Sequence, residues 1–155
     1  MTKTVAKCLL SFNESTYQKE LSVNFVKEFF KNPTRGYGAG VQTLFHQLKK
    51  TKFEDVLAPA SQQFNGQGSF GNGAAMRISP VALYCVNKSD EFLIDLVKKT
   101  SIVTHSNIIG INGAILQALA LSRNLKIDPS EGIDVKVYLG ELIKAFENVE
   151  KGEDE

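Results

Sequence analysis

The sequence predicts an all-α fold, and two features support this. Apolar residues recur three and four positions apart along nearly the whole chain, which is the period of one helix face, and strand-like alternation is nearly absent. The 155 residues are 43% hydrophobic and 23% charged, a composition typical of one globular domain. Because the chain shows no internal repeat or linker, we expect a single helical bundle.

The first half of the chain is expected to hold three helices and a short helical piece at 53–57. The first begins near the N-terminus, and its inward face holds Val5, Leu9 and Phe12, with Ala6 and Leu10 beside them. The second ends before Pro33, since backbone before a proline disfavours the helical region; its inward residues are Leu21, Phe25, Val26, Phe29 and Phe30. The third follows a glycine-rich connection at 35–40 and buries Val41, Leu44, Phe45 and Leu48.

The second half is expected to be helical beyond a polar, glycine-rich loop at 61–73. Helix-period runs cover 74–86, 90–103, 107–121 and 135–149. Asp90 and Glu91 lie in the first turn of their helix, where the dipole favours negative charge. The charged residues 150–155 are expected to fray as a solvated tail.

The charge balance excludes a strong net positive charge that would attract polyanions. Lys and Arg number 18 against 17 Asp and Glu, a net charge of +1, so we expect no direct nucleic acid or membrane partner. No apolar stretch approaches a bilayer span and no signal peptide is visible, which predicts an intracellular protein of the cytoplasm, nucleus or mitochondrion. Cys8 and Cys85 lie in apolar runs without metal or disulfide spacing, so we expect buried thiols.

The loop from Gly66 to Gly71 matches G-x-G-x-x-G, but its context does not fit a dinucleotide fold or a protein kinase. No buried strand precedes it, and the companion kinase motifs are missing. The loop can still bind an anion as such loops do, because glycines and the amides at a helix start can approach an anion closely. No carboxylate lies between Asp55 and Asp90, whereas Arg77 follows the loop, so the local field is positive.

A plain Ω-loop is the alternative interpretation of this segment. Ser69, Phe70 and Asn72 favour a binding loop, because they place a hydroxyl, an aromatic face and an amide among the glycines. This set suits a phosphate together with a ring or a sugar.

Two histidines are candidate functional residues. His105 lies in a polar break at the start of a helix. The alternative interpretation is that Ser106 or Asn107 caps this helix and His105 has no functional role. His46, in the middle of a helical run, is interpreted as a structural or surface residue. A stripe of small residues, Gly110, Gly113, Ala114 and Ala118, is interpreted as a place where helices pack closely.

Four segments resemble the ADP-ribosylglycohydrolase family. They are Arg-Gly-Tyr-Gly-Ala-Gly at 35–40, Phe-Asn-Gly-Gln-Gly-Ser-Phe-Gly-Asn-Gly-Ala-Ala-Met-Arg at 64–77, Thr-His at 104–105, and Asn-Gly-Ala-Ile-Leu-Gln-Ala at 112–118. The resemblance runs from residue 1 to about 148. It is closest to the branch that removes ADP-ribose from serine and degrades poly(ADP-ribose) and O-acetyl-ADP-ribose. It implies a hydrolase with an orthogonal helical bundle and two Mg²⁺ ions beside the terminal ribose.

The resemblance also implies roles for particular residues. The loop that would wrap the diphosphate and ribose consists of Gln67, Gly68, Ser69, Phe70, Gly71, Asn72 and Gly73. Phe64 would be a stacking surface, His105 a substrate contact, and Gly36 and Gly38 would line the same cleft. The implied partners are ADP-ribose or ADP-ribosylated proteins, and the complete enzyme is expected to be a monomer.

The acidic motifs that hold the family's metals are missing: a Thr-Asp-Asp-Thr run, an upstream Glu and a distal Asp-x-Asp-Thr. The pairs Glu54-Asp55 and Asp90-Glu91 point to different sides of a helix, so we expect no metal ligand and no catalytic residue in this chain. Residues 1–10 resemble the stretch that follows the first metal run. We therefore expect 1–149 to be the central part of the family domain, its bundle incomplete. The alternatives are a non-catalytic ADP-ribose-binding module and a degenerate structural fragment.

Overall fold

The structure, a computed structural model, describes residues 1–130 and 132–151. These residues form eight α-helices and one 3-10 turn, with no strand among them, which confirms the all-α prediction. The elements are α1 (Thr2–Leu10), α2 (Tyr17–Lys31), α3 (Ala39–Lys50), α4 (Ala58–Ser61), η1 (Ala75–Arg77), α5 (Ser79–Tyr84), α6 (Asp90–Ile102), α7 (Ile108–Asn124) and α8 (Val135–Lys151).

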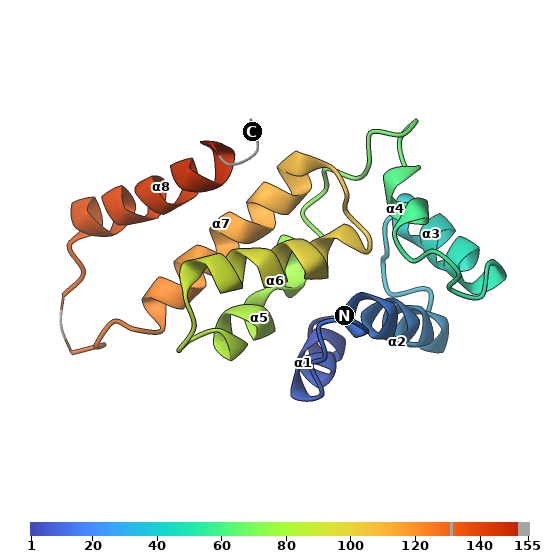
Figure 1. Cartoon of the computed structure of the whole chain (residues 1–155), viewed down its shortest axis with the longest axis horizontal. Coiled ribbons are helices and arrows are strands. Elements are labelled where there is room, and N and C mark those ends of the chain that lie inside the picture. The colour runs from blue at the N-terminus through green and yellow to red at the C-terminus, as the bar shows by residue number, and fades with distance from the viewer. Residues whose placement is uncertain (131, 152–155) are drawn as a thin grey trace.

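The helices gather around α7, which packs against α5, α6, α8 and η1. Figure 1 shows α5, α6 and α7 in the middle of the molecule, with α8 beyond α7 at one end. The blue and cyan helices α1, α2 and α3 lie toward the other end, where α1 packs on α2 and α5, and α2 packs on α3. The glycine-rich loop runs between these two groups, because it connects α4 to η1.

Most residues that the helical period placed inward lie in the core: Leu21, Phe25, Phe29, Leu44, Phe45 and Leu48 are almost fully buried, whereas Phe30 and Val41 are only partly buried. Tyr17, which is not among the predicted core residues, is also almost fully buried. The thiols of Cys8 and Cys85 are free and buried, as predicted, and burial raises the pKa of Cys85 to about 11. Within the described residues, no helix is both long and apolar enough to cross a membrane.

The expected helical piece at 53–57 is wrong. Lys52 and Phe53 adopt positive φ angles of 52° and 61°, which ends the helical backbone there. Helix α4 begins instead at Ala58, because the Asp55 carboxylate accepts hydrogen bonds from the amides of Leu57 (2.8 Å) and Ala58 (3.0 Å). These bonds lower the pKa of Asp55.

Three further expectations need correction. The run at 74–86 is not one helix but η1 followed by α5, since Pro80 has no N–H and lies in the first turn of α5. Leu10 does not lie beside the buried face of α1; its side chain is 90% exposed. Helix α8 continues to Lys151, past the expected start of the tail at 150, and residues 152–155 lie outside the described residues.

Candidate functional site

Segments far apart in the sequence surround one cavity of about 640 Å³. Its walls come from residues 1–2, the connection at 35–41, the loop and η1 between 63 and 77, and residues 104–105 after α6. Phe25 of α2 and Phe45 of α3 close the apolar side. The volume is that of a small-molecule site.

The cavity brings together most of the residues that the sequence singled out. Its lining includes Gly36, Gly38, Phe64, Ser69, Gly71, Asn72, Gly73 and His105. The backbone amides of Ser69, Phe70, Asn72 and Gly73 find no acceptor among the residues that the structure describes. No acceptor in the described part of the protein therefore competes for these four donors.

Gln67, Gly68 and Phe70 do not line this cavity; two of them attach the loop to the start of α7. The Gln67 carbonyl accepts a hydrogen bond of 2.8 Å from Asn107 Nδ2. Gly68 is buried, and a Cβ placed on it would lie 2.7 Å from the backbone nitrogen of Asn107. Asn107 itself caps α7 by accepting from the amide of Ile109 (3.0 Å).

Phe70 lies beside Phe64 rather than in the cavity wall. The two ring centroids are 5.6 Å apart and both side chains are more than half exposed. An exposed aromatic pair at the rim of a cavity offers a flat apolar surface to a ring.

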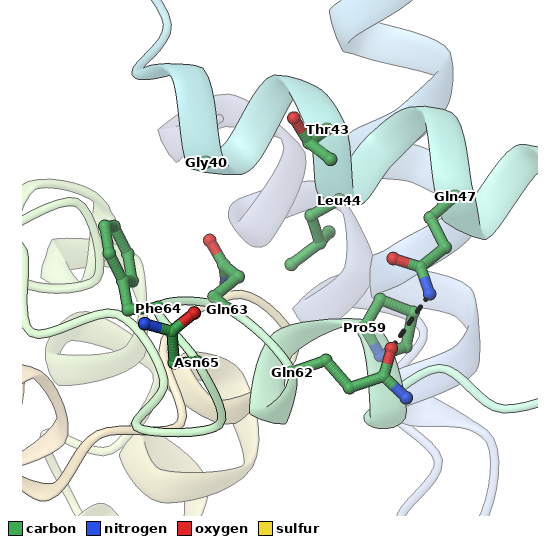
Figure 2. Close-up of a pocket in the computed structure, with 9 residues that line it drawn as sticks. All are labelled: Gly40, Thr43, Leu44, Gln47, Pro59, Gln62, Gln63, Phe64 and Asn65. Carbon is green, nitrogen blue, oxygen red and sulfur yellow. Dashed lines mark hydrogen bonds between the residues drawn. The ribbon is translucent and has the colours of Figure 1, made fainter.

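A second cavity of about 320 Å³ lies between α3 and the residues that follow α4. Figure 2 shows that it is lined by the amide side chains of Gln47, Gln62, Gln63 and Asn65, and that Gln47 donates to Gln62 (3.0 Å). Gly40, Gln63 and Phe64 line both cavities. This cavity could not be predicted from the sequence, because its lining carries no charged side chain that would mark it.

Arg77 is a buried cation in the wall of the larger cavity. Its side chain comes from η1, the residue is 5% exposed, and the guanidinium lies 4.8 Å from the centroid of the Phe25 ring. It donates to the carbonyls of Gly73 (3.2 Å) and Thr100 (3.1 Å) and to Thr104 Oγ1 (2.7 Å).

The Thr100 carbonyl belongs to the last turns of α6, where the helix dipole is negative. Burial lowers the pKa of Arg77 to about 10, so the guanidinium is charged at neutral pH. Arg77 forms no ion pair with a carboxylate among the described residues.

His105 lies next to this cation and is 7% exposed. Its Nδ1 is 2.7 Å from Thr104 Oγ1, and the far edge of its ring lies against Gly73, where an added Cβ would be 2.9 Å from Nε2. Burial, together with the charge of Arg77, lowers the pKa of His105 to about 4. The imidazole is therefore neutral at pH 7. His46 is exposed on α3, as interpreted from the sequence.

The stripe of small residues on α7 is only partly a packing surface. Ala114 and Ala118 are fully buried. Gly110, however, receives the glycine-rich loop rather than a helix, because a Cβ on it would lie 2.8 Å from the Ser69 carbonyl oxygen. Gly113 has nothing within 4 Å of its Cβ position, so its inclusion in the stripe is wrong.

The residues at the cavity do not fit a divalent cation. Among the described residues no three His, Cys, Asp or Glu side chains lie close enough together to hold a metal ion. None of the residues that line the larger cavity is an Asp or a Glu, the ligands that hard cations prefer.

The sequence belongs to a known family. The sequence model of the ADP-ribosylglycohydrolase family matches residues 1–153, so the chain belongs to this family, which confirms the resemblance. The chain is 38% identical to ADP-ribosylhydrolase ARH3 of Homo sapiens over 142 residues, which cover 92% of this chain and 38% of that protein.

Two further relatives agree. Identity is 38% over 151 residues with ADP-ribosylhydrolase ARH3 of Mus musculus, covering 97% of this chain and 39% of the relative. It is also 38% over 158 residues with that of Danio rerio, covering 99% and 40%. The chain thus spans about 38–40% of the length of these curated relatives.

Proposed function

We propose that this chain forms the ADP-ribose-binding part of an ADP-ribosylhydrolase. The observation that carries the proposal is a cavity in which amides without protein acceptors stand beside the buried cation Arg77, with no carboxylate in the lining. Such an environment suits the two negative charges of a diphosphate. The names of the relatives, ADP-ribosylhydrolase ARH3, support the same ligand.

The parts of ADP-ribose find matching groups around the cavity. The diphosphate would lie against the amides between Ser69 and Gly73, and a ring of the ligand would stack on Phe64 and Phe70. The proposed substrates of the complete enzyme are ADP-ribosylserine on proteins, poly(ADP-ribose) and O-acetyl-ADP-ribose, and the reaction is hydrolysis of the glycosidic bond.

The proposed cofactor of the complete enzyme is Mg²⁺, although the described residues that line the cavity do not fit it. A divalent cation in such an enzyme polarises hydroxyl groups and activates water. The carboxylates that such an ion prefers as ligands are absent from the residues that line the cavity.

Binding can be tested with a pair of glycine variants. Gly73→Ala is expected to weaken ADP-ribose binding about tenfold, the value of one lost hydrogen bond of about 1.4 kcal/mol, because its Cβ would lie 2.9 Å from the buried His105 ring. Gly113→Ala is the matched control, since Gly113 lies on the exposed side of α7 and its Cβ position is open. Titration calorimetry of both folded variants measures the difference.

Two results would count against the proposed function. The folded parent chain could give no heat with ADP-ribose at millimolar concentration, or Gly73→Ala could bind as tightly as Gly113→Ala. The first result would favour a structural fragment, and the second would place the ligand away from the glycine-rich loop.

The chain by itself is expected to release no measurable ADP-ribose from a serine-linked peptide in the presence of Mg²⁺. A general base and charge stabilisation each contribute orders of magnitude to the rate, and the cavity lining supplies no carboxylate for either. A full-length ADP-ribosylhydrolase ARH3 in the same assay serves as the positive control. Turnover by the chain approaching that of the control would disprove the expectation.

A further inference from the structure

We propose that Arg77 is a positioning residue that acts through Thr104 to hold His105 with its Nε2–H directed into the cavity. The proposal deepens the proposed function and rests on it, because this N–H is the donor that His105 would offer to a bound ADP-ribose. Arg77, Thr104 and His105 all line the cavity, so the three residues connect a buried charge to the ligand space.

The first step is the contact between Arg77 and Thr104. A guanidinium has only donors, so Thr104 Oγ1 must accept the 2.7 Å hydrogen bond from Arg77 Nη2. The further bonds to the carbonyls of Gly73 and Thr100 hold the guanidinium plane in place. The Thr104 hydroxyl therefore meets a fixed donor on one side.

The second step is the direction of the Thr104 hydroxyl hydrogen. Within the part of the chain that the structure describes, His105 Nδ1, at 2.7 Å, is the other group within hydrogen-bonding distance of Oγ1. If Thr104 donates to Nδ1, both contacts of Oγ1 are satisfied and the hydroxyl hydrogen is used. The neutral imidazole then carries its proton on Nε2.

The third step is the position of Nε2. This nitrogen faces Gly73 and Gly71, at 2.9 Å and 3.8 Å from the Cβ positions of these glycines. No hydrogen-bond partner of Nε2 is found among the described residues. Glycine at 73 leaves room for the ring, so that a neutral N–H donor stands beside the unpartnered amides of the loop.

The unfavourable free energy of burying the Arg77 guanidinium supports a functional role for this residue. Its Nε is buried without a hydrogen-bond partner among the described residues, and the guanidinium has no carboxylate partner there. A buried cation so incompletely paired destabilises the fold relative to an apolar side chain. The charge is therefore better explained by what it does to the cavity than by stability.

The test reads the protonation of the His105 ring in the protein without ligand. The chain has only two histidines, so His46→Asn leaves a single imidazole, and His46 does not line the cavity. Nitrogen-15 NMR of the ring in this background is expected to show a protonated Nε2 and an unprotonated Nδ1 at pH 7. A merely structural role for Arg77 would not require this tautomer.

Three variants in the same background complete the test. Thr104→Val removes the hydroxyl and is expected to move the proton to Nδ1 or to a mixture, and to weaken ADP-ribose binding about tenfold. Thr104→Ser is expected to restore both readouts. Arg77→Lys keeps the charge but loses the planar set of donors, and is expected to give a mixture of tautomers. It carries the test if Thr104→Val does not fold.

A protonated Nδ1 in the parent, or a parent-like spectrum in folded Thr104→Val, overturns the proposal. If Arg77→Lys shows the same spectrum and the same affinity as the parent, the proposed role of Arg77 is wrong. A parent with the expected spectrum that gives no heat with ADP-ribose refutes the proposed function alone, because the tautomer is measured without ligand.

Discussion

Gly68→Ala is expected to lower the free energy of unfolding by about 3 kcal/mol, the sum of backbone strain and a steric overlap. Gly68 has a φ of 71°, in the left-handed region that an L side chain rarely adopts. Its Cβ would overlap Ser106 Oγ and lie 2.7 Å from the backbone nitrogen of Asn107, and backbone cannot move aside as a side chain can. The loop would have to leave the start of α7.

Gly66→Ala separates the two contributions. Gly66 has a similar φ of 85°, but nothing lies within 4 Å of its Cβ position, so we expect a loss of only about 1 kcal/mol from backbone strain. Urea unfolding followed by circular dichroism measures both variants. Equal losses would mean that contact with α7 does not hold the loop.

Lowering the pH from 7 to 5 is expected to cost about 2 kcal/mol of stability through His105. The pKa of His105 falls from 6.5 to about 4 in the folded chain, because burial and Arg77 disfavour the charged ring. The unfolded chain therefore binds a proton first. The full stability is present above about pH 6.5 and is lost as the pH falls toward 4.

The control is His105→Asn, which cannot titrate in this range. The free energy of unfolding is measured at pH 7 and at pH 5 for both proteins. The change between the two pH values in the parent, minus the same change in His105→Asn, is the contribution of His105. The carboxylates whose pKa values are lowered by hydrogen bonds, such as Glu28, Asp55, Glu91 and Asp128, are shared by both proteins and cancel. Identical pH dependence in the two proteins would show that His105 is not held neutral by burial.

The longer helices could be predicted from the sequence because each has one apolar face. Leu21, Phe25 and Phe29 mark α2 by their spacing, and the structure buries all three. The segments that were predicted wrongly depend on single local contacts. Whether Asp55 caps a helix, or whether Phe53 adopts a positive φ, is decided by neighbours that periodicity does not describe.

The candidate site could be predicted only in part. The glycines could be singled out because they are concentrated in one loop, and His105 because it lies in a polar break between two helices. Most of these residues line one cavity. The connection from Arg77 to Thr104 spans 27 residues and has no local sequence pattern. The same holds for Gln63, whose side chain donates to the Thr104 carbonyl (2.8 Å) across 41 residues. Such contacts depend on how the folded chain brings η1 and the residues after α4 to the end of α6.

The walls of the cavity extend in sequence from Met1 to His105, with contributions from residues 1–2, 25, 35–45, 63–77 and 104–105. Bringing such distant segments together is among the slow events of folding, because chain entropy opposes long-range contacts until most of them form together. During refolding, the cavity should therefore form in the final cooperative step rather than before it. Any ligand that binds the folded cavity would also raise the melting temperature, by an amount that grows with the logarithm of its concentration above Kd, so thermal shift is a direct screen for ligands of the cavity.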